Sequence, residues 1–364
     1  MTGILSQKSN SHPLRFLVPA YTGLGNFILM TPMIRELRNR FPASRIDILA
    51  GNSFGTESVL RGRPDLVNET LILSENASIL KKISFFLKLR GRYDVIFFPF
   101  CVMLRDIAIG AIVAGIPRRI GHAETVSTAY RFFFTDSVTY CGDEHEADIY
   151  LDLVEKLLGT GFERNYEQTV SVASELVSPA KEELDIYLDG HPFLALQVNA
   201  ANGSPTPKVW PEKHWQDLIL RMINEGYRLV VLGDQREQLY NGHLLSSFGK
   251  TVLDITGKLT IPEAALVISM SKGLICHDSG LMHVANAIGK PLLALYGPTD
   301  LNRTRPLGKL SHVLRLDLGC MPCLAKRKWS EAEAVEKCPD HACMTKIEPS
   351  SVFEHIKEIF PLKG

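Results

Sequence analysis

The sequence predicts an α/β protein made of two Rossmann-like domains, each with a doubly wound parallel sheet. Short apolar runs alternate with amphipathic segments along most of the chain, which is typical of parallel strands joined by crossover helices. The 364 residues exceed what one compact core normally holds. We expect a first domain at 1–175, a second at 176–349, and a C-terminal helix at 350–364 that returns to the first domain.

In the first domain, strands and helices are expected in regular alternation. An apolar run at 15–20 predicts the first strand, and the turn Gly23-Leu-Gly25 leads into a helix at about 26–41 with apolar residues at helical spacing. The elements expected after it are strands at 46–50, 71–73 and 93–98, and a basic helix at 78–90.

The second domain repeats this pattern after a charged helical segment at 174–190. The elements expected in chain order are a strand at 193–198, helix 214–225, strand 228–232, helix 235–248, helix 261–271, and finally helix 350–360. Two parallel sheets covered by helices follow from this order.

Composition and charge limit the function classes. Hydrophobic residues make up 45% and charged residues 22%, and forty basic side chains balance forty acidic ones. A chain with no net charge gives no indication of nucleic-acid binding, so any attraction to an anionic ligand would come from a local group of basic residues. The first twelve residues lack the pattern of a signal peptide. Pro99 and Arg105-Asp106 interrupt the most apolar zone, 95–116, so we expect no membrane span and a cytoplasmic location.

The stretch from Gly273 to Thr299 predicts one βαβ unit. Asp278 and Ser279 stand where its helix should begin, and their side-chain oxygens can accept the first free backbone N–H groups. The small residues Ser279 and Gly280 would let a phosphate or pyrophosphate approach the positive end of that helix. An ordinary crossover with a capped helix is the alternative.

Several motifs in chain order resemble those of the ADP-heptose heptosyltransferases, glycosyltransferase family 9. They are Gly23-Leu-Gly25-Asn26 with Thr31-Pro32, Arg119-Ile-Gly121, His145-Glu146 to Gly159, Pro207-Lys208-Val-Trp210-Pro211-Glu212, and Asp278-Ser-Gly-x-Met-His283 with Lys290-Pro291 and Tyr296-Gly297-Pro298-Thr299. The similarity covers about residues 14–356. It implies the GT-B architecture, in which two Rossmann-like domains face a cleft, with the acceptor on the first domain and the nucleotide-sugar donor on the second.

The resemblance also implies roles for residues of the second domain. Lys208 would hold the donor pyrophosphate and stabilise the departing ADP, as a flexible ammonium in a polar loop can do. A surface lysine, a surface-helix glutamate and a core histidine are the alternatives for Lys208, Glu237 and His283. The expected donor-binding residues are Ser204, Lys208, Glu237, Gly257, Leu259, Asp278, Ser279, Gly280, Met282 and His283.

Asn26 departs from the family pattern, which usually has an aspartate there, viewed as the base that takes the acceptor proton. An amide does not accept a proton usefully at pH 7. Another group is then the base, with Asp106 as a candidate, or Asn26 only orients the hydroxyl, or the protein is inactive. The expected catalytic residues are Asn26, Asp106 and Lys208, and the expected acceptor-binding residues are Gly23, Gly25, Asn26, Arg105, Arg118 and Arg119.

Four late cysteines form a C-x2-C and a C-x4-C pair: Cys320, Cys323, Cys338 and Cys343. Their spacing is similar to that of a four-thiolate site for zinc or iron, and related heptosyltransferases carry a similar cluster. Unpaired reduced thiols are the alternative. Catalysis itself is expected to need no cofactor, since Lys208 and fixed N–H dipoles can stabilise the leaving phosphate charge.

The resemblance therefore implies an inverting glycosyltransferase that moves heptose from ADP-heptose to a saccharide acceptor, the inner core of lipopolysaccharide. The expected partners are ADP-heptose, an anionic saccharide or lipid-linked acceptor, and the inner face of the inner membrane through peripheral contact, but not nucleic acid. Two other functions stay open. The same family can act on a protein or secondary-metabolite acceptor, and Asn26 raises the alternative of a catalytically silent sugar-nucleotide binding protein.

Overall fold

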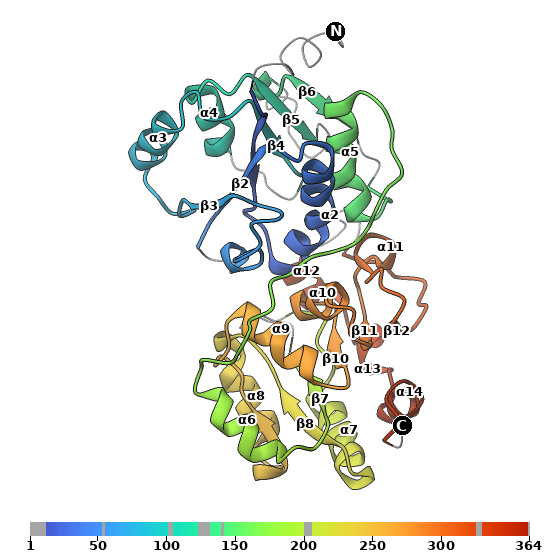
Figure 1. The fold of residues 1–364 in the computed structure, drawn as a ribbon. Coiled ribbons are helices and arrows are strands. Elements are labelled where there is room, and N and C mark those ends of the chain that lie inside the picture. Colours follow the sequence, from blue (N-terminus) through green and yellow to red (C-terminus); the bar gives the residue numbers. More distant parts are fainter. Residues whose placement is uncertain are drawn as a thin grey trace. The chain divides into compact units, whose positions relative to one another are not determined.

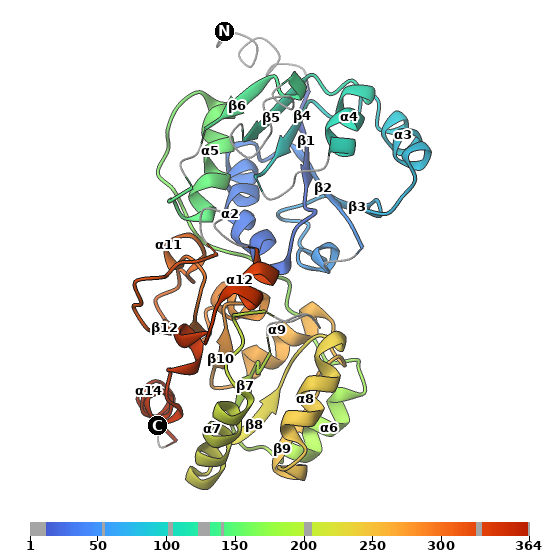
Figure 2. The same cartoon turned by 180° about the vertical axis from the view of Figure 1, so that it is seen from behind.

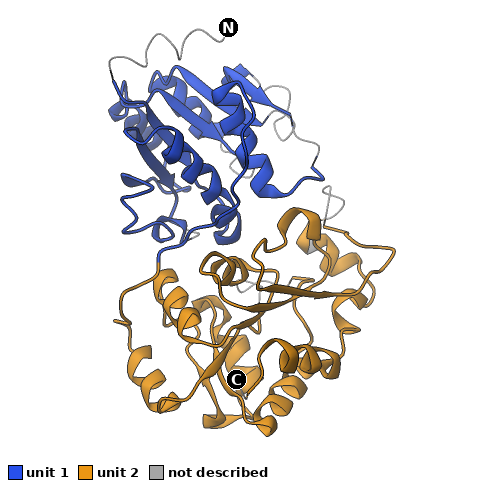
Figure 3. Ribbon diagram, turned by 45° about the vertical axis from the view of Figure 1, so that its right-hand side comes forward, with its two compact units in different colours: residues 1–171 blue, residues 172–364 orange. Residues whose placement is uncertain are grey.

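The computed structural model describes residues 12–52, 55–100, 105–122, 132–139, 142–199, 206–324 and 330–362. The chain divides into two compact units, Met1–Ser171 and Val172–Gly364, which Figure 3 colours separately. The division lies four residues before the boundary expected from the sequence.

Unit 1 contains a six-stranded parallel sheet with the strand order β3-β2-β1-β4-β5-β6. Its elements are β1 (Arg15–Pro19), α2 (Leu24–Arg40), β2 (Arg45–Ala50), η1 (Thr56–Ser58), β3 (Glu69–Ile72), α3 (Ile79–Lys88), β4 (Val95–Phe98), α4 (Arg105–Val113), β5 (Arg118–His122), β6 (Asp136–Val138) and α5 (Glu146–Leu158). Helices α2 and α5 pack together on one face of the sheet, and α3 and α4 on the other (Figures 1 and 2). Right-handed crossovers produce this arrangement.

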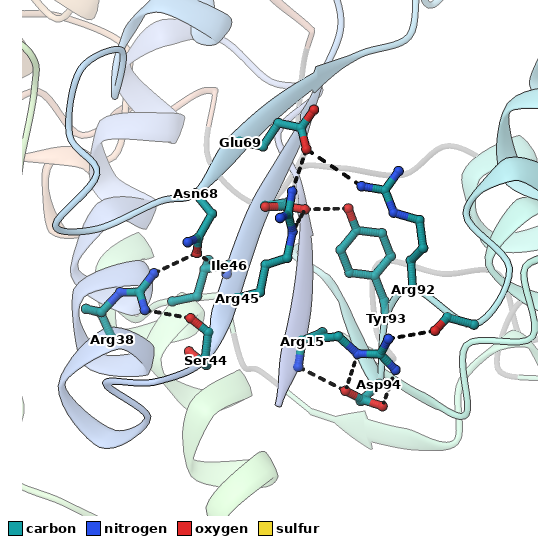
Figure 4. A network of polar contacts seen from close by, with 12 residues as sticks. Arg15, Arg38, Ser44, Arg45, Ile46, Asn68, Glu69, Arg92, Tyr93 and Asp94 are labelled. Carbon is teal, nitrogen blue, oxygen red and sulfur yellow. Dashed lines mark hydrogen bonds and ion pairs between the residues drawn. The ribbon is translucent and has the colours of Figure 1, made fainter. Parts of the chain in front are cut away.

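The amino ends of several strands in unit 1 are held by polar contacts, some partly and some fully buried (Figure 4). The Arg15 guanidinium donates to both carboxylate oxygens of Asp94, at 3.1 Å each. Asp47 is fully buried and accepts from Arg45 at 2.7 Å and from the Tyr93 hydroxyl at 2.6 Å. Ion pairs therefore fix the amino ends of these strands. Helices α2, α4 and α5 each follow a strand at the opposite, carboxyl edge of the sheet, where open α/β sheets usually bind ligands.

Unit 2 contains a second six-stranded parallel sheet, with the order β12-β11-β10-β7-β8-β9. Its elements are α6 (Ala180–Leu188), β7 (Phe193–Leu196), α7 (Glu212–Glu225), β8 (Arg228–Val231), η3 (Gln235–Glu237), α8 (Gln238–Leu245), η4 (Gly249–Thr251), β9 (Val252–Asp254), α9 (Ile261–Met270), β10 (Leu274–His277), α10 (Gly280–Ala287), β11 (Leu292–Tyr296), α11 (Leu301–Thr304), β12 (Ser311–Arg315), α12 (Glu331–Lys337), α13 (Ala342–Thr345) and α14 (Pro349–Ile359).

The C-terminal helix packs on α7 within unit 2, which corrects the expectation that it returns to the first domain. Val352, Ile356 and Phe360 recur every four residues, and all three are buried in the core of unit 2. The Tyr227 hydroxyl also donates to the Phe360 carbonyl oxygen at 3.0 Å. An apolar stripe shows that a helix is buried on one side, but it does not say which unit buries it.

The most apolar zone of the sequence forms β4 and α4, as a strand followed by a packed helix. Gly110 of α4 lies so close to α3 that a Cβ there would stand 2.1 Å from the Phe86 ring, so the two helices pack tightly. Within the described ranges, no helix is both long enough and apolar enough to cross a lipid bilayer.

Candidate functional site

The turn between β10 and α10 differs from its predicted form. Ser279 takes the N-cap position with extended backbone angles, but its side chain accepts no N–H group of α10. Its hydroxyl instead donates to Oε1 of Gln197, which follows β7. The Asp278 carboxylate is almost fully buried and lies near Lys208. The predicted side-chain cap from Ser279 is therefore corrected, and the first N–H groups of α10 keep no cap from it.

Lys208 is brought to this turn by its neighbours in the sequence. The backbone N–H of Trp210 donates to Nε2 of His277 at 2.9 Å, and the Trp210 indole donates to the Ile347 carbonyl oxygen at 3.0 Å. The Lys208 ammonium then lies 3.6 Å from Oδ2 of Asp278 and 3.0 Å from Oε1 of Glu331. Three segments of unit 2 that are distant in sequence thus meet at one ammonium group.

The electrostatics of this contact favour the charged form of Lys208. Burial lowers the pKa of its ammonium, but the carboxylates of Asp278 and Glu331 outweigh that effect, so the pKa is raised overall. The fully buried His277 ring behaves in the opposite way, because burial lowers its pKa to about 3. His277 is therefore neutral and can accept the Trp210 N–H group that positions the lysine loop.

The residues expected around the nucleotide follow β8 and β9 at the same, carboxyl edge of this parallel sheet. Glu237 is buried, and its Oε2 accepts the Asp234 backbone N–H at 2.9 Å within a capping box. Gly257 has a φ of +73°, and a Cβ there would lie 2.7 Å from Nε2 of Gln238, so this position requires glycine. Leu259 after it is half-buried.

The remaining expected donor residues occupy different surroundings. Met282 and His283 are both buried in α10, with 0% and 3% of their surfaces exposed, whereas Gly280, at the start of the same helix, is partly exposed. Ser204 lies outside the residues that the structure describes. Within the expected donor set, Lys208 and Asp278 form an ion pair with each other.

In unit 1, Gly23 is the N-cap of α2, and Gly25 and Asn26 lie in the first turn of that helix. The Asn26 amide donates from Nδ2 to Oε2 of Glu146, the first residue of α5, at 2.9 Å. Glu146 is buried, with 4% of its surface exposed. Sequence reasoning did not select Glu146, although it matched part of a family motif, because nothing in the sequence pairs it with Asn26.

Asp106 and Arg105 begin α4, which lies on the face of the sheet opposite α2 and α5 (Figures 1 and 2). The Asp106 carboxylate accepts from the Lys82 ammonium of α3 at 2.8 Å, so it already neutralises a mostly buried cation. Arg105 is exposed. The structure thus brings Asn26 to Glu146 and not to Asp106.

Arg118 and Arg119 do not lie at the carboxyl edge, because they begin β5 at its amino end. The Arg118 guanidinium donates to Asp136 at 3.1 Å and to the Leu157 carbonyl oxygen at 3.1 Å. Arg119 donates to the Phe133 carbonyl oxygen at 2.7 Å. The acceptor role expected for both arginines is therefore corrected to structural contacts within unit 1.

The four late cysteines lie near one another in unit 2 as free thiols. The pKa of the Cys343 thiol is raised to about 11, chiefly by burial and then by the thiols of Cys323, Cys338 and Cys320. Cys320 is exposed, whereas Cys323 and Cys343 are buried. Across the described part of the chain, no three His, Cys, Asp or Glu side chains are grouped in a way that could hold a metal ion, so the predicted zinc or iron site gains no support.

Comparisons with known proteins identify the family and support the fold of this chain. The model of "Glycosyltransferase family 9 (heptosyltransferase)" matches residues 89–333. Lipopolysaccharide heptosyltransferase 2 of Escherichia coli (strain K12) is 24% identical over 370 residues, covering 95% of this chain and 98% of that protein.

Solved structures share the fold. The E. coli ADP-heptose lps heptosyltransferase II superposes with a TM-score of 0.74 at 22% identity, covering 95% of this chain and 98% of that one. A glycosyl transferase family 9 protein from Veillonella parvula superposes with a TM-score of 0.77 at 19% identity, covering 95% and 97%. These likenesses confirm the predicted fold class, GT-B with two Rossmann-like units. Because the family model spans more than half of the sequence, the chain belongs to glycosyltransferase family 9, the heptosyltransferases, and is a glycosyltransferase.

Proposed function

We propose that this chain transfers heptose from ADP-heptose to the inner core of lipopolysaccharide, with inversion at the anomeric carbon. The donor and acceptor classes come from the relatives, which include an ADP-heptose enzyme and lipopolysaccharide heptosyltransferases. The observation that carries the proposal is the meeting of the Lys208 ammonium with the turn at Asp278, ahead of a helix that Ser279 leaves without a side-chain cap.

The donor pyrophosphate binds at this turn. The first backbone N–H groups of α10 carry partial positive charge and the Lys208 ammonium carries a full one. Together they would bind the pyrophosphate, as helix N-termini bind phosphate in other proteins. When the bond from the anomeric carbon to the phosphate oxygen breaks, its electron pair stays on ADP. Fixed dipoles and a cation aimed at that growing charge stabilise the transition state, so the transfer needs no metal ion or redox cofactor.

Glu237 and Gly257 hold the nucleoside part of the donor in this proposal. They follow neighbouring strands, β8 and β9, at the sheet edge that also carries the Lys208 loop. Gly257 lets the chain turn closely around Gln238, and in this proposal the base of the nucleotide lies against that turn.

The acceptor binds at the loop that precedes α2 in unit 1. A Cβ at Gly23 would have only Asn26 Oδ1 within 4 Å, at 4.0 Å, among the described atoms, so the turn is open on that side. Arg105 is an exposed cation in the first turn of α4, and α4 likewise follows a strand at the carboxyl edge. An exposed guanidinium there suits a phosphorylated or carboxylated saccharide.

A lipid-linked acceptor requires contact with the inner face of the membrane, and α3 offers a surface for it. Leu80, Ile83 and Leu87 recur at helical spacing and are 77%, 40% and 49% exposed. Lys81 and Lys88 are exposed on the same helix, which contains no acidic residue. A helix with exposed apolar and basic side chains is typical of proteins that bind anionic lipid surfaces.

Helix α4 extends this surface, since it packs beside α3 (Figures 1 and 2). Arg105, Ile109 and Ile112 are exposed and share one side of α4 by their spacing. Together with Leu80, Ile83, Leu87, Lys81 and Lys88 they make up what we call the α3–α4 surface. Peripheral attachment through it would place the protein at the cytoplasmic side of the inner membrane.

Asn26 motivates the competing function, a silent sugar-nucleotide binding protein. Both functions include ADP binding, so transfer itself must be measured. The test is incubation of the purified chain with ADP-heptose and lipopolysaccharide that lacks inner-core heptose, followed by mass spectrometry of the lipopolysaccharide. We expect the acceptor to gain one heptose. ADP-heptose binding with no change in any acceptor mass would favour the silent protein, and transfer to a protein or metabolite alone would change the acceptor class.

A further inference from the structure

The contact between Asn26 and Glu146 joins the first turns of two helices at the carboxyl edge of the first sheet. Asn26 lies in the first turn of α2, which follows β1, and Glu146 begins α5, which follows β6. The residues are 120 positions apart, and their side chains meet at 2.9 Å because α2 and α5 pack together.

The direction of this hydrogen bond assigns a chemical role to each partner. Nδ2 of Asn26 is the donor and Oε2 of Glu146 the acceptor, so the amide is matched to a carboxylate oxygen. A glutamate carboxylate can accept a proton, whereas the amide cannot do so usefully at neutral pH. Of the two residues in this contact, the glutamate is therefore the one that can accept a proton.

Two other carboxylates of unit 1, those of Asp106 and Asp148, have different partners. Asp106 is ion-paired with Lys82 of α3, on the other face of the sheet. Asp148, on the same helix as Glu146, is paired with Arg164 at 2.9 Å. Glu146 alone among these three is in hydrogen-bond contact with the first turn of α2, which the open side of Gly23 adjoins.

We infer that Glu146 is the general base of the transfer and that Asn26 positions its carboxylate. This rests on the proposed function, since it assigns the proton of that reaction. The acceptor hydroxyl oxygen forms the bond to the anomeric carbon while the bond from that carbon to the ADP phosphate breaks, with its electron pair leaving on ADP. The hydroxyl proton passes to the Glu146 carboxylate. Asn26 is thus a positioning residue, and Glu146 the catalytic one.

The arrangement can be tested by exchanging the two side-chain types. Glu146→Gln removes the proton acceptor and keeps the size of the side chain, so kcat should fall by roughly 10²–10⁴-fold with little change in KM for ADP-heptose. In Asn26→Asp/Glu146→Gln, the glutamine amide can donate to the new aspartate, so the hydrogen bond is kept and the carboxylate moves to position 26. We expect this double variant to recover much of the lost kcat.

Asn26→Asp alone places two carboxylates in contact, where they cannot both stay ionised without repulsion. Its kcat should therefore be no higher than that of the wild type. Asp148→Asn is the matched control, because it also removes a carboxylate from the first turn of α5 but leaves the Asn26 contact intact. It should keep a kcat close to that of the wild type.

Wild-type turnover in the same assay tests the proposed function, and the ratios among the variants test Glu146. Melting temperatures of all variants are measured alongside. A low kcat in Glu146→Gln that the double variant restores supports the inference. An unchanged kcat in Glu146→Gln overturns it. A loss of kcat that follows a lowered melting temperature and is not restored in the double variant also overturns it, because the pair would then only fasten α2 to α5.

Discussion

The ammonium nitrogen of Lys208 lies 3.0 Å from Oε1 of Glu331 in α12. The lysine is therefore held by a carboxylate of its own chain at the place where we propose that it meets a phosphate. Glu331 is half exposed, and ion pairs of that kind contribute only about 0–1 kcal/mol. A pyrophosphate, with more charge and more oxygens, should compete successfully for the ammonium.

Lys208→Ala should weaken ADP binding by about 10- to 100-fold, because a hydrogen bond to a charged group contributes roughly 1.5–3 kcal/mol. Isothermal titration calorimetry with ADP measures the change directly. Lys213→Ala, at an exposed position in α7, is the matched control. Equal ADP affinity in Lys208→Ala and in the wild type would remove Lys208 from the donor site.

Glu331→Gln should strengthen ADP binding by up to about five-fold, because it removes a negative charge that competes for Lys208. Glu336→Gln, on the exposed side of the same helix, controls for the change in net charge. Calorimetry at low and moderate salt checks the effect, which should shrink as salt screens the charges. Weaker ADP binding in Glu331→Gln would mean that Glu331 assists the nucleotide instead.

The buried His277 ring should make the protein less stable in acid. Its pKa is lowered in the folded state to about 3 by burial, while an unfolded histidine titrates near 6.5, so the unfolded chain binds the proton first. The contribution is complete above about pH 6.5 and is lost as the pH falls toward 3. Between pH 7 and pH 5 it amounts to about 2 kcal/mol of unfolding free energy.

Urea denaturation at pH 7 and pH 5 measures how much His277 contributes to the change in unfolding free energy. The loss of stability between the two pH values should be smaller in His277→Gln than in the wild type by about that amount. His312→Gln, at an exposed position, is the control. Identical losses in His277→Gln and the wild type would show that His277 is not held neutral by burial.

The late cysteines should differ in reactivity toward an alkylating reagent at pH 8. Cys320 is exposed, whereas Cys343 is buried and has a pKa raised to about 11, so little of it is thiolate. Mass spectrometry of iodoacetamide-treated protein should find Cys320 modified well before Cys343. One equivalent of zinc or iron by elemental analysis, with all four thiols protected, would instead restore the metal site predicted from their spacing.

The α3–α4 surface should bind vesicles that contain anionic lipid. Leu80→Gln should weaken that binding about five-fold or more, because inserting a leucine side chain in an apolar layer is worth at least about 1 kcal/mol. Leu239→Gln replaces a leucine that is 89% exposed in unit 2 and is the control. Co-sedimentation with phosphatidylglycerol and phosphatidylcholine vesicles measures both. Equal binding of the two variants, or no binding to either lipid, would contradict this surface.

Much of the donor edge could be predicted from the sequence. The apolar run from Gly273 to Cys276, the polar turn after it and the strand from Leu292 are local patterns. The structure has them with bounds shifted by at most one residue, since β10 is Leu274–His277 and β11 is Leu292–Tyr296. The meeting of Lys208 with Asp278 is also foreseeable, because the loops that carry them follow β7 and β10, which are neighbours in the sheet. Parallel strands bring such loops to one edge.

Contacts that depend on packing between distant elements could not be predicted. The bond between Asn26 and Glu146 requires β6 at the end of the sheet and α5 against α2, and no local pattern encodes either. The Lys208–Glu331 pair likewise depends on where α12 folds back. The structure places Arg118 and Arg119 at the amino end of β5 and not at the carboxyl edge expected for an acceptor site. A basic pair beside a motif indicates a polar position, but it does not indicate which end of a strand the pair occupies.

Acceptor-dependent release of ADP from ADP-heptose is the measurement that tests the central claim most directly. The initial rate is followed with and without lipopolysaccharide that lacks inner-core heptose, for the wild type and for Lys208→Ala. Our account predicts a rate that rises with acceptor concentration in the wild type and falls by at least about ten-fold in Lys208→Ala. Tight ADP-heptose binding with no ADP release at any acceptor concentration would contradict it.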